Sequence, residues 1–122
     1  MSEIGTKAPK EGEYSNGKFW FSRKGSTITL GLTSSAVDEI GQVESVDLPD
    51  DGDDFDMGEV CVTIEGSKGT IELVTPAAGI VEEANRAIDE EPDMVSEDPL
   101  EEGWLVKIEM QDSTDLQEFI GD

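Results

Sequence analysis

The stretch VCVTIEGSKGTIELV, at residues 60–74, decides the fold of this chain. Its first part alternates as a strand does, and residues 70–74 form the returning strand. The two sides of the first strand are Val60, Val62 and Ile64 on one side and Cys61 and Thr63 on the other. In the turn between the strands, Gly66 and Gly69 flank Lys68, and we expect both glycines to adopt positive φ. The stretch therefore predicts a β-hairpin with an exposed lysine at its tip.

Strand-like sequence recurs on both sides of this hairpin. We expect further strands at residues 18–21, 27–32, 43–48, 80–83 and 104–110, separated by turn signals such as Arg23-Lys24-Gly25-Ser26. Short strands at this spacing are typical of an all-β barrel or sandwich with small helices. We expect residues 1–16, which are polar, to be a flexible lead-in and residues 17–122 to form a single domain.

Helical signals are few and short. Thr33 or Ser34 is suited to cap a helix over residues 35–40, and Gly41 is suited to end it. Residues 84–90 are expected to be helical, whereas Pro92 and Pro99 predict an irregular segment. Near the end of the chain, Thr114 and Gln117 resemble a capping box that opens a short helix.

Charge dominates the composition. The 122 residues include 30 acidic and 8 basic side chains, which gives a formal net charge of −22. Such a charge repels nucleic acid and anionic membranes, favours basic partners, and is also typical of proteins from a high-salt cytoplasm. The sequence shows no apolar stretch of membrane-spanning length and no signal-peptide core, and its single cysteine cannot form an internal disulfide. We therefore expect a cytoplasmic protein.

The absence of histidine from the sequence excludes much chemistry. It rules out a Ser-His-Asp triad, a Cys-His pair and zinc sites that need imidazole ligands. The aspartates of residues 50–56 lack the ligand spacing of a calcium loop, so we expect a solvated turn and no metal site. Cys61 is expected to be a small buried residue, and Trp20 and Trp104 to lie in the core or in the wall of a cleft. No catalytic residue is predicted.

The surroundings of Lys68 resemble those of lipoyl and biotinyl carriers. Gly52 stands 16 residues before Lys68 and Gly79 stands 11 residues after it, a spacing seen in those domains. The similarity is strongest to the glycine cleavage system H proteins and spans about residues 19–120, without gaps from Trp20 to Gly52. Its most specific part is EPDMV at residues 91–95, followed by Asp98-Pro99 and Glu102-Gly103-Trp104.

This resemblance implies a barrel-sandwich hybrid with short flanking helices, and a carrier that is not an enzyme. It implies covalent lipoate on Lys68, with Glu65 and Ser67 as neighbouring cofactor-binding residues and Glu65 placed to help dock the lipoylating enzyme. The implied partners are glycine decarboxylase, aminomethyltransferase, dihydrolipoamide dehydrogenase and a lipoate ligase or lipoyl transferase. No nucleic acid or membrane partner is implied, and we expect a monomer.

Two stretches depart from the family pattern. The family's Ser-His-Glu-Trp-like motif reads Gly17-Lys18-Phe19-Trp20 here, so Phe19 replaces a glutamate that helps line the cleft for the loaded arm. Glu39 stands where a histidine is common. A cationic amine would then have to be met by another acidic residue, such as Glu11, Glu13 or Glu39.

Several alternatives follow from these departures. The chain could serve as an H-like lipoate carrier of another pathway, such as heterodisulfide-reductase-like sulfur oxidation, or as an unmodified acidic interaction module. Biotin carriers usually have methionine on both sides of the lysine, and carriers of 2-oxoacid dehydrogenases usually have aspartate before it. Ser67 and Gly69 occupy those positions here, which favours an H-like lipoyl carrier.

Overall fold

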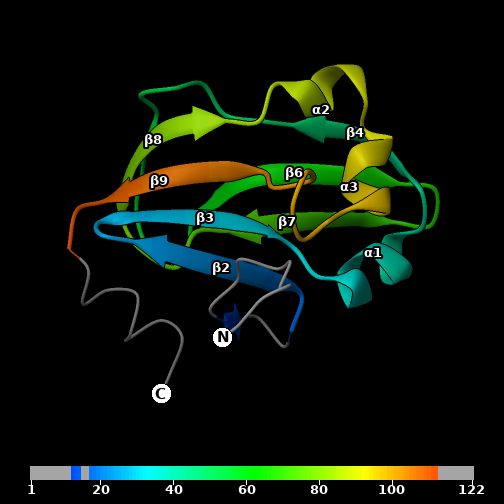
Figure 1. The fold of residues 1–122 in the computed structure, drawn as a ribbon, viewed down its shortest axis with the longest axis horizontal. Helices are drawn as coiled ribbons and strands as arrows, with labels where there is room; N and C mark the ends of the chain where they lie inside the picture. The colour runs from blue at the N-terminus through cyan, green and yellow to red at the C-terminus, as the bar shows by residue number, and fades with distance from the viewer. Residues whose placement is uncertain (1–11, 15–16, 113–122) are drawn as a thin grey trace, which may run out of the picture.

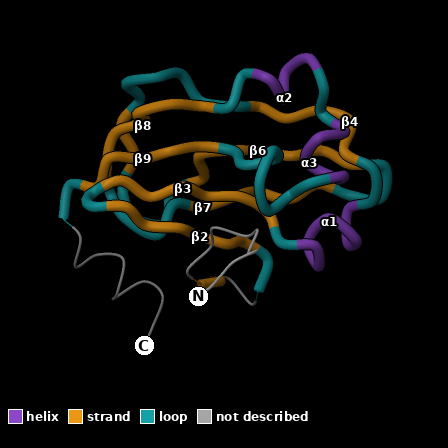
Figure 2. Tube along the Cα trace, viewed as in Figure 1, coloured by secondary structure: helices purple, strands orange, loops and turns teal. Residues whose placement is uncertain are grey.

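The computed structural model describes residues 12–14 and 17–112, which form a mainly β fold (Figures 1 and 2). The elements in chain order are β1 (Gly12–Tyr14), β2 (Phe19–Lys24), β3 (Thr27–Leu32), α1 (Ser34–Ile40), β4 (Val43–Asp47), β5 (Asp54–Phe55), β6 (Val60–Gly66), β7 (Thr70–Val74), β8 (Gly79–Ala84), α2 (Ala87–Glu90), α3 (Asp93–Glu97) and β9 (Val106–Met110). The predicted helix over residues 114–119 lies outside the described residues.

The strands form two antiparallel sheets. The larger sheet has the strand order β1-β2-β3-β9-β8-β5, and the smaller has the order β4-β6-β7. Apolar side chains of both sheets build one core, in which Leu30, Ile64 and Ile108 are fully buried. The Tyr14 hydroxyl donates a hydrogen bond of 2.8 Å to the Val74 carbonyl, which ties β1 to β7.

The helices described here gather at one end of the sheets, on the right in Figure 1. The turn between β6 and β7 points to the same end, beside α1. The strands pair Ile64 with Ile71 and Glu65 with Thr70, so the predicted β-hairpin is confirmed. The fold therefore brings the tip of the hairpin and the helices onto one surface.

Strict alternation fails at the start of β6. A shift in the β6–β7 pairing lies between Val60 and Val62. As a result Cys61 and Val62 are both buried, whereas Val60 is 41% exposed, so the predicted two-sided pattern is wrong at Val60. Cys61 is a small buried residue as expected.

Three further differences from the sequence predictions concern element boundaries. Strand β1 lies within the segment that was expected to be a flexible lead-in, and it pairs with β2. The helical segment predicted at residues 84–90 is helical only over α2. Helix α3 occupies the stretch between Pro92 and Pro99 that was expected to be irregular, and Val95 anchors it in the core.

Candidate functional site

Lys68 lies at the tip of the β6–β7 hairpin, and its side chain is exposed. It makes no ion pair and no side-chain hydrogen bond with any residue in the described part of the chain. By contrast, Lys18 pairs with Glu39 at 3.8 Å and Lys107 pairs with Glu83 at 3.9 Å. Lys68 thus offers a primary amine, on a long side chain, that no described residue occupies, which suits a lysine that another enzyme acylates.

The backbone around Lys68 is held firmly although the side chain is free. The tip closes on itself through a hydrogen bond of 2.8 Å from the Gly66 amide to the Gly69 carbonyl. The Lys68 amide donates to the Ile40 carbonyl at 2.7 Å, and the Ser67 amide donates to the Gln42 carbonyl at 2.9 Å. The Gln42 amide donates in return to the Ser67 hydroxyl at 3.2 Å. The tip is therefore docked on the C-terminal end of α1.

Glycines make this docking possible. At the tip they do so by letting two backbone segments approach closely, and not by adopting positive φ. Neither Gly66 nor Gly69 has the positive φ that the sequence predicted, whereas Gly41 has a φ of 80°. A Cβ at Gly66 would overlap the Ile40 carbonyl oxygen, whereas a Cβ at Gly69 would meet no atom within 4 Å. A Cβ at Gly41 would lie 2.5 Å from the Ser67 hydroxyl. The need for glycine at residue 66 comes from α1, which no local turn pattern reveals.

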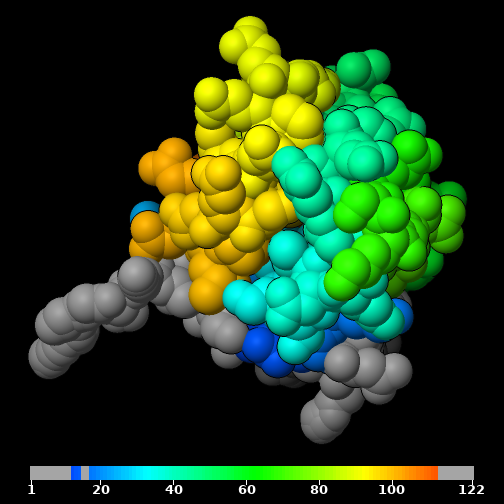
Figure 3. Space-filling model, turned by 90° about the vertical axis from the view of Figure 1, so that its right-hand side faces the viewer, coloured from blue at the N-terminus to red at the C-terminus, as the bar shows by residue number. Residues whose placement is uncertain are grey.

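Sequence reasoning missed residues 40–42, which lie between the tip and α3. The Gln42 side chain donates to the Asp93 carboxylate at 3.1 Å, and the Val43 amide donates to the Ser96 hydroxyl at 3.0 Å. The one signal in the sequence was Gly41, which predicted the end of a helix. It did not indicate which segment packs against residues 40–42. Figure 3 looks onto this end of the molecule, where the segment after α1 lies between the hairpin and the later helices.

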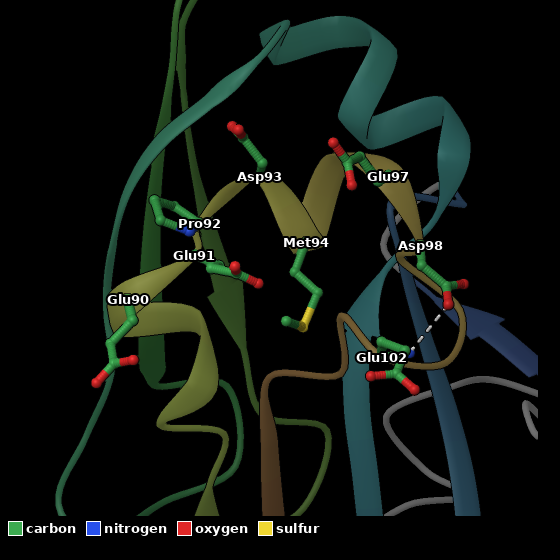
Figure 4. Close-up of a pocket in the computed structure, with 8 residues that line it drawn as sticks. All are labelled: Glu90, Glu91, Pro92, Asp93, Met94, Glu97, Asp98 and Glu102. Atoms are coloured by element: carbon green, nitrogen blue, oxygen red, sulfur yellow. Dashed lines mark hydrogen bonds between the residues drawn. The ribbon is translucent and has the colours of Figure 1, made fainter.

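An acidic pocket of about 490 Å³ lies beside α3 (Figure 4). Its lining residues are Glu90, Glu91, Pro92, Asp93, Met94, Glu97, Asp98 and Glu102. The fold gathers Glu90, Glu91 and Glu102 with the carboxylates of α3. Among the described residues, no group of acidic or cysteine side chains has the arrangement of a metal site.

The three predicted site residues lie in one hairpin but do not all interact. Glu65 is exposed on β6, and its carboxylate accepts a hydrogen bond of 3.3 Å from the Ser45 hydroxyl. It forms no ion pair with Lys68. Ser67 directs its hydroxyl to Gln42, toward α1. The structure thus places Glu65 on the flank of the tip and Ser67 in its contact with α1.

The structure also shows where the residues that depart from the family pattern lie. Phe19 is buried, and its ring centroid lies 5.3 Å from that of Tyr14, so it is a core residue and lines no charged cleft. Glu39 is engaged with Lys18. Glu11 lies outside the described residues, and Glu13 is exposed on β1.

The two tryptophans have different surroundings. Trp20 is fully buried, and its indole N–H donates to the Pro99 carbonyl at 2.9 Å. Gly31 lies directly across from Trp20, where a Cβ would lie 2.6 Å from the indole. Trp104 is half-buried, with the Lys107 ammonium 4.9 Å from its ring centroid. Trp20 is a core residue as predicted and links β2 to the segment after α3.

Burial changes the acidity of two side chains near the core. Burial raises the pKa of the Cys61 thiol to about 12, and it raises the pKa of the Tyr14 hydroxyl well above its ordinary value. Neither group is a thiolate or phenolate near neutral pH. A redox or nucleophilic role for Cys61 is therefore not supported.

The described residues contain no helix long and apolar enough to cross a membrane. What the site offers chemically is one exposed amine on a rigid tip. That arrangement fits covalent attachment of a carboxylic acid cofactor such as lipoate, because the amine is accessible and no described side chain blocks it.

Comparisons with known proteins agree on one family. Residues 12–122 match the family model described as glycine cleavage H-protein. The chain is 39% identical to the glycine cleavage system H protein of Anaeromyxobacter sp. (strain K) over 89% of its length and 85% of that protein. It is 34% identical to the protein of the same name from Thermotoga maritima, over 88% of this chain and 87% of that one.

A solved structure agrees as well. The glycine cleavage system H protein from Mycobacterium marinum superposes with a TM-score of 0.76 at 26% identity, covering 96% of this chain and 90% of that one. The two-sheet arrangement with short helices thus matches a known carrier fold, and the predicted barrel-sandwich hybrid is confirmed.

Proposed function

The chain belongs to the glycine cleavage H-protein family, and from this premise we propose that Lys68 is the residue that carries its lipoyl group. As a member of this family the protein is a lipoyl carrier in glycine cleavage and not an enzyme. A role in another pathway is not favoured, because the relatives carry the name of the glycine cleavage component.

One observation carries the assignment to Lys68. Its amine is exposed and unengaged, while its backbone amide is fixed to the Ile40 carbonyl at 2.7 Å. A ligase therefore meets a side-chain amine that is free to move, attached to a backbone that is held in place. Lys24 is also exposed at a hairpin turn, between β2 and β3, but its backbone has no hydrogen bond to any helix that the structure describes.

Bound lipoate would supply a dithiolane that accepts and releases the transferred fragment. The protein's own part is attachment and presentation. Lys68 supplies the amide nitrogen, Ser67 anchors the tip to α1, and Glu65 presents a carboxylate on the flank toward the lipoylating enzyme. Because the lipoyl-lysine is long and the hairpin tip that carries it is fixed, the dithiolane stays at a high effective concentration near a docked enzyme.

The family implies that the protein works with the other components of glycine cleavage. We propose that these are glycine decarboxylase, aminomethyltransferase and dihydrolipoamide dehydrogenase, with a lipoate ligase or lipoyl transferase for modification. A monomeric state, a cytoplasmic location and a carrier domain over residues 17–122 stay predictions, although β1 extends the paired strands to residue 12.

The attachment site is tested by intact mass and peptide mapping after incubation with lipoate, ATP and a lipoate ligase. We expect one lipoyl increment on the peptide that contains Lys68, its loss in Lys68→Arg and its retention in Lys24→Arg. A lipoyl increment elsewhere, or none on a folded sample with several ligases, would reject Lys68; the second result would indicate an unmodified interaction module.

The pathway is tested with the loaded carrier and glycine decarboxylase. We expect the lipoylated protein to support glycine–bicarbonate exchange and Lys68→Arg to abolish it, with unchanged thermal unfolding because the side chain is exposed. Exchange at the wild-type rate with Lys68→Arg would contradict the proposal.

A further inference from the structure

We propose that Ser67 is a positioning residue for the modification of Lys68, acting through residues 40–42 at the end of α1, here called the seat. This inference rests on the proposed function of Lys68. It goes beyond that function because it assigns a role to a hydroxyl group and to a helix end that do not touch the cofactor.

The first argument is the number and direction of contacts between the tip and the seat. Two tip amides, those of Ser67 and Lys68, donate to seat carbonyls, at 2.9 and 2.7 Å. One seat amide, that of Gln42, donates to the Ser67 hydroxyl at 3.2 Å. Ser67 therefore both donates to and accepts from Gln42. It is the tip residue that both donates a hydrogen bond to the seat and accepts one from it.

The second argument is steric. Gly41 and Gly66 let the two backbones approach, since a Cβ at either would collide with the opposite segment. A Cβ at Gly41 would lie 2.5 Å from the Ser67 hydroxyl and 3.0 Å from the Lys68 Cγ. The Ser67 hydroxyl thus fills the space over Gly41. The Lys68 Cγ also lies over Gly41, so the first part of the Lys68 side chain rests on the seat while its amine stays free.

The third argument is that the seat itself is fixed from the opposite side. Gln42 donates to Asp93 of α3 at 3.1 Å, and the next residue, Val43, donates its amide to Ser96 of α3 at 3.0 Å. The Ile40 side chain is buried in the core. Because the seat is held by α3 and the core, a hydrogen bond from the tip to the seat fixes the tip relative to the whole domain.

The consequence is preorganisation of the modified lysine. Turns at hairpin tips usually sample several conformations, and an enzyme that acylates a lysine there must select the productive one. Removing one hydrogen bond should lower the equilibrium constant for docking of the tip on the seat by about fivefold, which corresponds to the typical net contribution of such a bond. Other surfaces that a ligase can recognise do not change.

The test compares lipoylation kinetics of the full chain with lipoate, ATP and a lipoate ligase. For Ser67→Ala we expect kcat to fall, by up to about fivefold, with little change in KM for the carrier. Ser67→Thr keeps the hydroxyl and should restore most of the rate. Ser35→Ala is the matched control, because Ser35 is an exposed serine on α1 whose side chain has no hydrogen bond to the tip in the described structure. It should react like wild type.

Hydrogen exchange gives a readout that does not depend on the ligase. In the wild type the Lys68 and Ser67 amides should be protected, and Ser67→Ala should speed their exchange while amides of β3 and β9 stay unchanged. Gly66→Ala should remove the protection, because a Cβ there displaces the tip from Ile40, whereas Gly69→Ala should retain it.

The outcomes separate this inference from the proposed function. If wild-type Lys68 is not lipoylated, the proposed function fails, and unprotected tip amides in the wild type would overturn the docked tip independently. If Lys68 is lipoylated but Ser67→Ala reacts at the wild-type rate, Ser67 does not position it. A rate loss that accompanies faster exchange throughout the sheets, or that Ser67→Thr does not rescue, would also overturn the role.

Discussion

The Cys61 thiol shows how burial controls chemistry at the scale of a single residue. Its exposed fraction is 6%, and its sulfur lies 3.5 Å from the Leu73 carbonyl, to which it donates. Burial disfavours the thiolate and raises the pKa of the thiol to about 12, from an ordinary value of 9.0. The folded state therefore holds the proton more tightly than the unfolded state.

This difference predicts a loss of stability at alkaline pH. Below pH 9 the thiol is protonated in both states, and between about pH 9 and 12 only the unfolded state ionises, so stability falls as pH rises. In urea unfolding, the free energy lost between pH 7 and 10.5 should be about 2 kcal/mol smaller in Cys61→Ala than in the wild type. Tyr14 acts in the same direction, so part of the loss persists.

Val62→Ala is the control for this prediction, because it truncates the next buried residue of β6 without removing a titratable group. It should lower stability at both pH values and keep the full alkaline loss. Equal pH dependence in Cys61→Ala and Val62→Ala would contradict the assigned role of the thiol.

Much of the residue-level picture was predictable, and the failures share one cause. The burial of Cys61 and Trp20 followed from their strand sequence, and Lys68 stood out through its turn. The need for glycine at residue 66 comes from the Ile40 carbonyl, and Gly31 faces Trp20 on the neighbouring strand. Such requirements arise from contacts between segments, so a pattern of neighbours along the chain could not reveal their physical reason.

At the scale of elements, helix α1 depends on its N-terminal cap. The Thr33 hydroxyl accepts from the Ala36 amide at 3.3 Å and donates to the Gly17 carbonyl at 2.6 Å. The helix has only seven residues and no acidic side chain in its first turn, so little else stabilises its start. Because α1 ends in the seat, its cap also supports the tip that carries Lys68.

Thr33→Val should lower the free energy of unfolding by about 1–2 kcal/mol, because it removes the cap and leaves the Gly17 carbonyl without its hydroxyl donor. Thr33→Ser keeps the hydroxyl and should lose much less. Urea unfolding followed by tryptophan fluorescence measures both. A loss in Thr33→Ser as large as that in Thr33→Val would contradict this prediction, because it would show that the methyl group contributes at least as much as the capping hydroxyl.

Elements with strong local signals were predicted well, and those with weak signals were not. The cap at Thr33 and the stop at Gly41 defined α1 to within one residue. Helix α3 was missed because its five residues carry three charged or polar side chains and lie between two prolines. It forms because Val95 is buried, Ser96 binds the Val43 amide and Gly103 allows close packing against the Met94 and Asp98 carbonyls.

At the scale of the whole molecule, the net charge of −22 is poorly balanced by ion pairs. The described residues show four, namely Lys18–Glu39, Arg86–Asp50, Arg86–Asp89 and Lys107–Glu83, at 3.5 to 3.9 Å. All involve side chains that are more than a third exposed, where such pairs contribute little. Repulsion among the remaining carboxylates therefore opposes the compact state.

Screening this repulsion should stabilise the protein. Raising NaCl from 0.1 to 1 M shortens the screening length from about 10 Å to about 3 Å, so we expect Tm to rise by several degrees. Salt also strengthens apolar burial, and a matched variant separates the two effects. Glu90, Glu97 and Glu101 are exposed, and none of their side chains has a hydrogen bond or ion pair with a described residue.

The triple variant Glu90→Gln, Glu97→Gln and Glu101→Gln should therefore have a higher Tm than the wild type in 0.1 M NaCl. It should also gain less from added salt, because three charges of the repelling set are gone while the buried apolar surface is unchanged. Thermal unfolding of both proteins across the salt series measures the difference. Curves that coincide across the salt series would mean that salt acts through apolar burial, and that these three charges cost the fold no stability.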